Sequence, residues 1–141
     1  MKLKIATPER VIYEADVDAV SCPTEMGEIT ILPNHIPLVA NLKPGELKVM
    51  DNSEPRYIFV AGGFVEVRPG NEVMILADAA EREEEIDIAR AEEARKRAQK
   101  LLGEKIQSEE EYAAVAASLE KSLARLKISK RRKYRDVGKK M

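Results

Sequence analysis

The sequence predicts an α+β protein in which an N-terminal antiparallel β-sandwich over residues 1–80 is followed by a C-terminal antiparallel two-helix hairpin over residues 81–141. Two observations lead to this class. Pro and Gly turns punctuate the first half at short intervals, whereas the second half is rich in Ala and charge and almost free of Gly and Pro. The apolar residues also change their spacing, from every second residue to every third or fourth, near Ala79-Ala80.

Short strands account for the first half. Leu3 and Ile5 alternate with polar neighbours, as strands with one buried face do. Further strand candidates, separated by Pro, Gly or Asn, are Val11–Tyr13, Val17–Ala19, Glu28–Leu32, Leu47–Met50, Tyr57–Ala61, Phe64–Val67 and Glu72–Leu76. We expect turns at Glu54-Pro55 and at Pro69-Gly70-Asn71, because Pro presets one dihedral and Gly and Asn accept a positive φ. Many short, closely spaced strands are typical of a sandwich or barrel.

The first helix is predicted from about Glu83 to Leu102. The residues that recur at helical spacing are Ile88, Ala91, Arg95, Ala98 and Leu102. We expect Gly103 to end the helix, because Gly readily adopts the left-handed cap conformation. The acidic residues Glu81, Glu83, Glu84, Glu85 and Asp87 suit the start of a helix, where the macrodipole favours negative charge, better than they suit a metal site.

The second helix is predicted to begin after Ser108, because Ser108 with Glu111 three residues later forms a capping-box pattern. Its apolar stripe is Tyr112, Val115, Leu119, Leu123 and Leu126. The intervening loop, Gly103 to Gln107, is short enough for an antiparallel hairpin. Since the interface is rich in Ala, it buries little apolar area, and each Å² of buried apolar area contributes about 25 cal/mol. The two helices are therefore expected to hold one another weakly and to be able to open.

Composition excludes several classes of protein. The chain has 24 Lys and Arg against 25 Asp and Glu, a net charge of −1, which argues against a surface built throughout for nucleic acid. One Cys and one His exclude an internal disulfide and a zinc cage from this chain alone. No apolar run approaches the ~20 residues of a membrane helix, and Met1–Ile5 begins as a strand instead of a signal segment. We expect a soluble protein of a reducing compartment.

No catalytic signature is present. The sequence lacks the common phosphate-loop, dinucleotide, zinc-protease and C-x-x-C motifs. Cys22 has only His35 as an available base, and both lie near prolines, so a buried thiol and a turn histidine are the expected interpretation. We therefore predict no catalytic residue and no metal ligand.

The C-terminal tail is strongly basic. Its cations are Lys127, Lys130, Arg131, Arg132, Lys133, Arg135, Lys139 and Lys140, with Asp136 the acid among them. The tail can be a solvated helix end, which cations suit, or a patch that seeks an acidic protein surface or phosphates. A nucleic-acid-associated or ribosome-associated protein would use it as an arm. That alternative lacks interleaved aromatic residues for stacking, so no nucleic-acid partner is expected.

Three segments resemble the epsilon subunit of bacterial F-type ATP synthases, the family of chloroplast epsilon and mitochondrial delta subunits. Residues 27–39 read GEITILPNHIPLV and are similar to the family's G-E-x-x-I-L-P-x-H-x-P-L segment. Residues 62–67 read GGFVEV and resemble its G-G-F-x-E-V strand. Residues 79–82, leading into residues 86–91, form the third match, and the resemblance runs nearly end to end.

The resemblance implies a non-catalytic central-stalk subunit. The sandwich would bind the gamma subunit and the membrane-embedded c-subunit ring, coupling ion flow to rotation, on the cytoplasmic side of the bacterial cell membrane and peripheral to it. The hairpin would lie folded or extend toward the beta and alpha subunits, where basic residues meet acidic segments of beta and impede ATP hydrolysis. The residues that we expect to make these inhibitory contacts are Arg125, Lys130, Arg131 and Arg132.

The resemblance also implies a regulatory nucleotide site, although no cofactor is required. Residues 86–91, IDIARA, fit the I-D-x-x-R-A motif through which some relatives bind ATP. Asp87, Arg90 and Arg97 fall in one helical sector, because seven residues return almost to the same azimuth. Lys121 and Arg125 would supply charge for the phosphates of ATP with Mg, but Lys121 stands where the family prefers Arg and lacks its planar fork. The alternative is an ordinary Asp87–Arg90 intrahelical pair.

Overall fold

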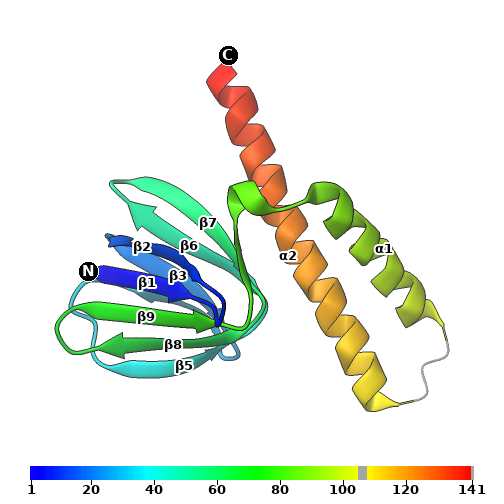
Figure 1. Cartoon of the computed structure of the whole chain (residues 1–141), viewed down its shortest axis with the longest axis horizontal. Coiled ribbons are helices and arrows are strands. Elements are labelled where there is room, and N and C mark those ends of the chain that lie inside the picture. The colour runs from blue at the N-terminus through cyan, green and yellow to red at the C-terminus, as the bar shows by residue number, and fades with distance from the viewer. Residues whose placement is uncertain (105–107, 141) are drawn as a thin grey trace. The chain divides into compact units, whose positions relative to one another are not determined.

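The computed structural model of the chain describes residues 1–104 and 108–140, with side chains as far as residue 131. The described structure forms two compact units, Met1–Glu84 and Glu85–Met141. The first unit contains the strands and the second contains the two long helices (Figure 1). The break between them falls four residues after residue 80, inside a short 3-10 helix at residues 83–85 that follows a short strand.

The first unit is one folded sheet (Figure 1). Its strands are β1 (Lys2–Ala6), β2 (Val11–Asp16), β3 (Ala19–Thr24), β4 (Gly27–Ile31), β5 (Leu38–Leu42), β6 (Gly45–Asp51), β7 (Glu54–Val60), β8 (Gly63–Arg68), β9 (Glu72–Ala77) and β10 (Ala80–Arg82). The order is β10-β7-β6-β3-β5-β8-β9-β1-β2, with β4 paired to β3. Since β10 and β2, the two ends of this path, also approach one another, the sheet nearly closes. The predicted N-terminal sandwich is confirmed.

Strand pairing is antiparallel throughout this unit except between β1 and β9, which run parallel. The parallel pair arises because β1, at the N-terminus, closes the sheet beside β9, the last long strand. Strands β5 and β10 were not predicted, and neither was β3 beyond Ala19, because the predicted strand Val17–Ala19 falls mostly between β2 and β3. Most prolines lie between strands as expected, but Pro23 lies inside β3 and Pro55 inside β7. At Pro23 the ladder from β3 to β6 has already stopped, at Ser21.

Two predicted turns had different outcomes. The turn at Glu54-Pro55 was wrong, because both residues belong to β7 and Pro55 is the register partner of Met50. Asn52 and Ser53 make that turn instead, with φ of 52° and 66°. The turn at residues 69–71 is confirmed between β8 and β9, with positive φ at Gly70 and Asn71.

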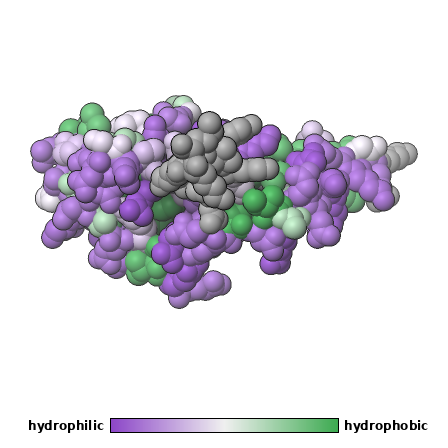
Figure 2. Space-filling view, turned by 90° about the horizontal axis from the view of Figure 1, so that it is seen from above, coloured by the Kyte–Doolittle hydropathy of each residue, from purple (hydrophilic) through white to green (hydrophobic). Residues whose placement is uncertain are grey.

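The core of the first unit comes from alternate residues of the paired strands. Leu47 faces Ile58 across β6 and β7, and Val65 faces Ile75 across β8 and β9. All four are at most 2% exposed. On β6 and β8 the outward neighbours are more exposed, whereas on β7 Phe59, next to Ile58, is buried as well. Hydrophilic residues dominate the face shown in Figure 2. The period of two that predicted the strands therefore also predicted the buried face.

The second unit begins its first long helix later than predicted. A 3-10 helix (η1, Glu83–Glu85) comes first, and α1 spans Ile88–Gly103. The acidic residues 81–85 therefore precede α1 and do not form its first turn, which contains no acid. The backbone leaves helical geometry at 86 and 87 because Asp87 takes an extended conformation, φ −85° and ψ 104°, to act as the N-cap.

The ends of the hairpin helices were predicted with mixed success. Gly103 is the last residue of α1 but not a left-handed cap; Glu104 ends the helix in an extended conformation, and its N–H donates to the Leu101 carbonyl. Helix α2 spans Glu109–Lys140. Its predicted cap is confirmed, because the Glu111 N–H donates to Ser108 Oγ at 3.1 Å. The predicted loop lies partly outside the described residues.

Candidate ligand and regulatory sites on the helical hairpin

The Asp87 side chain accepts a hydrogen bond from the backbone at the start of α1. Its Oδ1 accepts the backbone N–H of Arg90 at 3.1 Å, and its carbonyl accepts the N–H of Ala91 at 3.0 Å. The first bond satisfies an amide that would otherwise lack a partner at a helix start, and the second is the first hydrogen bond of the helix itself. The contact that the structure shows between the two motif residues is therefore a cap on the Arg90 amide, whereas the alternative raised from the sequence was an intrahelical side-chain pair.

Helices α1 and α2 run antiparallel. A groove of about 190 Å³ is lined near one end by Leu101 and Ala114, and a second groove is lined near the other end by Ile88 and Lys130. Residues early in α1 are therefore level with residues late in α2. The seam is lined by small side chains, since Ala91 and Ala98 are buried and Ala98 lines the smaller groove with Ser118. The predicted antiparallel hairpin with its Ala-rich seam is confirmed.

Four of the predicted nucleotide-site residues share one face of the hairpin, which we call the arginine face. Arg97 lines the smaller groove opposite Ser118. On α2, Lys121 and Arg125 follow Ser118 by three and seven residues, so they continue its face. On α1, Arg90 precedes Arg97 by seven residues and is exposed, as Arg97 is. Since the helices are antiparallel and Arg97 lies opposite Ser118, Arg90, seven residues earlier, comes level with Arg125, seven residues later, and Lys121 falls between these two levels; such an arrangement can bind several phosphate oxygens.

A larger groove lies on the other side of the seam, and the sequence analysis did not predict it. Its volume is about 670 Å³, and its lining residues are Ile88, Glu92, Arg95, Leu123, Leu126, Lys127, Ser129 and Lys130. We call it the mixed groove. The spacing of Ile88, Glu92 and Arg95 by four and three residues was the signal that could have found it. Of the residues predicted to act, Lys130 is the one that lines it.

An ion pair organises the α1 side of the mixed groove. The Arg95 guanidinium pairs with the Glu92 carboxylate and donates to Gln99 Oε1 at 3.0 Å. Its hydrogen bonds lower the pKa of the Glu92 carboxyl, and the positive charges of Arg95, Lys96 and Lys130 act in the same direction. Glu92 therefore stays ionised, and the groove carries three cations and one paired acid.

The residues predicted to make inhibitory contacts are divided between the two faces. Arg125 belongs to the arginine face, whereas Lys130 lines the mixed groove. Arg131 is the next residue of α2 and is partly exposed. Arg132 lies in α2, but its side chain is outside the described part of the chain. A partner that contacts both Arg125 and Lys130 therefore has to reach both sides of the seam.

The lone thiol is part of the sandwich core. Cys22 lies on β3, is fully buried, and is the register partner of Ile29 on β4. Burial raises the pKa of its thiol to about 12, so it remains protonated and unsuited to nucleophilic attack. His35 lies in the β4–β5 loop with Nδ1 2.7 Å from the Ile36 carbonyl. Among the described residues, no group of three or more His, Cys, Asp or Glu is placed to hold a metal ion.

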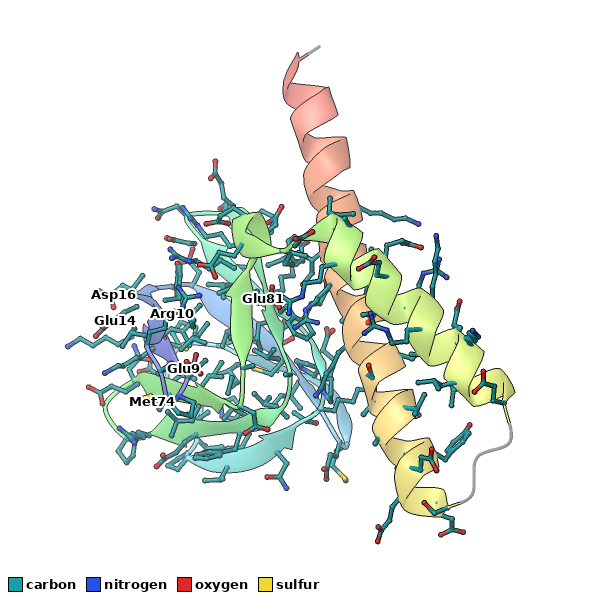
Figure 3. All side chains as sticks on the ribbon, turned by 45° about the vertical axis from the view of Figure 1, so that its right-hand side comes forward. Glu9, Arg10, Glu14, Asp16, Met74 and Glu81 are labelled. Atoms are coloured by element: carbon teal, nitrogen blue, oxygen red, sulfur yellow. The ribbon has the colours of Figure 1, made fainter. Side chains whose placement is uncertain are left out.

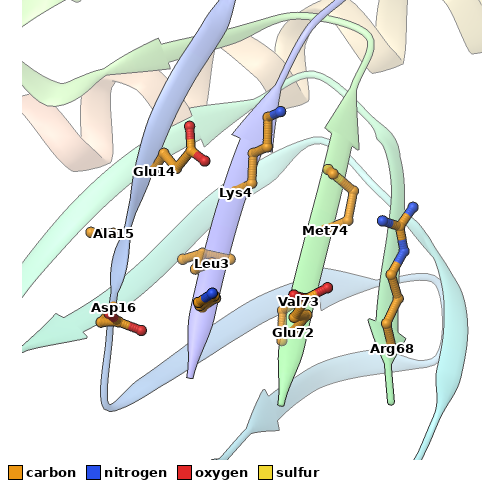
Figure 4. Close-up of a pocket in the computed structure, with 10 residues that line it drawn as sticks. Leu3, Lys4, Glu14, Ala15, Asp16, Arg68, Glu72, Val73 and Met74 are labelled. Carbon is orange, nitrogen blue, oxygen red and sulfur yellow. The ribbon is translucent and has the colours of Figure 1, made fainter. Parts of the chain in front are cut away.

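The sandwich has a shallow cavity of about 370 Å³ over β1, β2 and β9 (Figure 4). Lys4 on β1 faces Glu14 on β2 (Figure 4), and Lys2 is the register partner of Asp16, which lies on β2 with Glu14 (Figure 3). Such opposite-charge cross-strand pairs stabilise neighbouring strands. The positively and negatively charged side chains that line the cavity balance, and none of the predicted site residues lies there. We therefore attribute these charges to strand pairing and not to a ligand site.

In the described parts of α1 and α2, neither helix is long and apolar enough to cross a membrane.

The fold defines a class in which a β-sandwich precedes a helical hairpin, and both parts match models of one family. Residues 1–83 match the ATP synthase, Delta/Epsilon chain, beta-sandwich domain, and residues 84–130 match the ATP synthase, Delta/Epsilon chain, long alpha-helix domain. The chain belongs to the delta/epsilon chain family of ATP synthases. The resemblance found in the sequence is thereby confirmed.

Curated relatives agree over nearly the whole chain. The ATP synthase epsilon chain of Dehalococcoides mccartyi is 47% identical over 138 residues, which cover 97% of this chain and 98% of that one. The ATP synthase epsilon chain of Herpetosiphon aurantiacus is 43% identical over 135 residues, covering 96% and 98%. The similarity therefore includes the hairpin as well as the sandwich.

Solved structures show the same fold. A chain in the OSCP/F1/c-ring structure of the Euglena gracilis mitochondrial ATP synthase matches with a TM-score of 0.75 and 25% identity, over 86% of this chain and 76% of that one. A chain in the central stalk/c-ring structure of the Tetrahymena thermophila mitochondrial ATP synthase matches with a TM-score of 0.68, over 91% and 95%. At 16% identity, the second match shows the fold alone.

Proposed function

We propose that this chain is a non-catalytic rotor subunit in the central stalk of an F-type ATP synthase, where it couples ion translocation to ATP synthesis. The observation that carries the proposal is the near full-length similarity to ATP synthase epsilon chains. The sandwich would bind the gamma subunit and the c-subunit ring, and the hairpin would reach the beta and alpha subunits. The bacterial relatives support a place on the cytoplasmic side of the cell membrane, peripheral to it.

The hairpin would restrain ATP hydrolysis by opening and meeting acidic surfaces of beta. Two features support this regulatory role. The seam contributes small buried side chains such as Ala91 and Ala98, so separating the helices exposes little apolar area. The second half of α2 is cationic, and complementary charge speeds association and orients the partners. A weakly held element with two arrangements is what a switch of this kind requires.

Inhibition can be tested in the assembled catalytic complex. Changing Arg125, Lys130, Arg131 and Arg132 together to Gln is expected to relieve much of the inhibition of ATP hydrolysis, since it removes four charges from the contact. The matched control changes Lys2, Lys43, Lys96 and Lys100 to Gln and should keep the inhibition. Equal inhibition by both variants would remove the regulatory assignment. Failure of the wild-type chain to co-purify with gamma would overturn the rotor assignment itself.

ATP with Mg would act as a regulatory ligand on the arginine face. Arg90, Arg97, Lys121 and Arg125 would supply the charge for its phosphates, and Asp87 would cap the turn of α1 that carries Arg90. Bound nucleotide would bridge α1 and α2 and favour the closed hairpin, because a ligand stabilises the state that it binds better.

Calorimetric titration with ATP and Mg tests this site. Arg90→Ala and Arg97→Ala should each weaken binding about tenfold, in keeping with the loss of one hydrogen bond to a charged group. Lys96→Ala removes an exposed cation from the same helix and should leave the affinity unchanged. Equal losses in all three variants would point to general electrostatic attraction and would reject the site.

A further inference from the structure

The charge of this chain is concentrated at one end. Residues 121–141 contain ten Lys and Arg and one Asp, whereas the whole chain has a net charge of −1. The rest of the protein is therefore net acidic. An anionic surface would repel most of the molecule and attract the second half of α2, so the charge distribution alone selects which face can approach it.

Helix α2 extends beyond its partner helix. Ile88 begins α1 and lines the mixed groove with Lys127 and Lys130 of α2, so the two helices come level there. From Lys130, α2 continues to Lys140, about 15 Å farther at 1.5 Å per residue (Figure 1). No described residue of α1 is level with that extension. The hairpin thus ends in a single cationic helix.

The mixed groove adds apolar surface beside this cationic end. Ile88 is 54% exposed and Leu123 is 48% exposed, and both line the groove with Leu126. Arg95, Lys127 and Lys130 line it as well, and its acid, Glu92, is engaged by Arg95. A ligand that fits this surface has an anionic part for the cations and an apolar part for the exposed Leu and Ile side chains.

The sequence continues the same spacing past the groove. Leu123 and Leu126 are followed by Tyr134 and Val137 at the same helical spacing, with the cation Lys130 between the two pairs. Apolar residues at this spacing among many cations are the pattern of a basic amphipathic helix, which lies at the interface of a membrane. An acidic protein surface would satisfy the cations but would leave this apolar stripe unused.

We propose that the mixed groove and the C-terminal end of α2 bind the surface of an anionic lipid bilayer. The cations contact lipid headgroups, and Ile88 and Leu123 contact the first methylenes of the chains. This inference is independent of the proposed rotor function. It has one consequence for that function: Lys130 cannot contact lipid and an acidic protein segment at the same time, so the two partners compete for the hairpin.

Flotation of the full-length chain with vesicles tests the proposal. The chain should bind vesicles of phosphatidylcholine mixed with phosphatidylglycerol at low salt, and should release as salt rises. Changing Lys127, Lys130 and Arg131 to Gln should weaken binding about 100-fold, taking roughly fivefold per cation near an anionic membrane. The matched control changes the exposed sandwich residues Lys2, Lys43 and Lys48 to Gln and should bind as the wild type does.

The apolar contribution is tested separately by Leu123→Gln. This half-exposed position tolerates the change, which circular dichroism would verify, and vesicle binding should weaken about fivefold with an unchanged salt dependence. Equal binding to pure phosphatidylcholine would overturn the proposal, as would an equal loss in the sandwich control. Wild-type binding by Leu123→Gln would overturn the role of the groove. Binding to an acidic peptide without binding to vesicles would identify a protein partner instead.

Discussion

The N-cap at Asp87 gives the sharpest prediction about the nucleotide motif. Asp87→Ala removes the Oδ1 acceptor that holds the Arg90 N–H at 3.1 Å. Because Asp87 is exposed, the loss involves no buried side chain, and the cost is that of a cap, about 1 kcal/mol. This corresponds to about a fivefold increase in opening of the first turn, which carries Arg90.

The assay is amide hydrogen exchange of Arg90 and Ala91 in the free protein. Asp87→Ala should speed exchange at both amides about fivefold, with little change at the C-terminal end of α1. Asp87→Asn and Asp87→Ser should stay within about a factor of two of wild type, because Asn and Ser also cap helices well. Unchanged exchange in the Ala variant, or equal acceleration in all three, would refute the cap.

Nucleotide titration of the same variants separates a positioning residue from a ligand contact. If Asp87 acts by holding Arg90 in place, Asp87→Asn should retain most of the ATP affinity while Asp87→Ala loses about fivefold. An Asn variant with protected amides but no ATP binding would show that the carboxylate itself contacts the ligand. Absence of ATP binding in the wild type would reject the nucleotide proposal and leave the exchange result standing.

Three further predictions concern the sandwich. Gly63→Ala should lower the free energy of unfolding by about 3 kcal/mol or more, since φ is 129° and a Cβ would lie 2.1 Å from a β9 carbonyl oxygen. Gly70→Ala, with open space around the added Cβ, should lower it by about 1 kcal/mol. Urea titration of the two variants measures both changes. Burial raises the pKa of the Cys22 thiol from 9.0 to about 12, so the folded state keeps a proton that the unfolded state releases. Stability should therefore fall as pH rises above about 9, and Cys22→Ala should remove that dependence. Tyr13→Phe loses the 3.2 Å hydrogen bond to Asp51 Oδ2 and should lower the free energy of unfolding by about 1 kcal/mol. A Phe variant as stable as the wild type would contradict the role of this hydrogen bond.

Sequence patterns predicted which residues could form the arginine face better than they predicted the role of Asp87. Seven-residue spacing predicted that Arg90 and Arg97 share a sector, and Lys121 and Arg125 were predicted to complete the site; the antiparallel hairpin is compatible with that arrangement, and of these four residues Arg97 lines the smaller groove. The role of Asp87 was not predicted, because a cap depends on where the helix begins. Acidic residues upstream made an earlier start plausible, and only the backbone at residues 86–87 shows that α1 begins at Ile88.

By itself, the sequence determined the two-part organisation, the class of fold, most strands and the family. These follow from the period of the apolar residues and from local turn chemistry, which act over a few residues. Tertiary structure alone decided the parallel pairing of β1 with β9, the strand that contains Pro23, and the mixed groove between Ile88 and Leu123. Each of these depends on which distant segments meet, and a local pattern cannot encode that choice because the same alternation fits several partners.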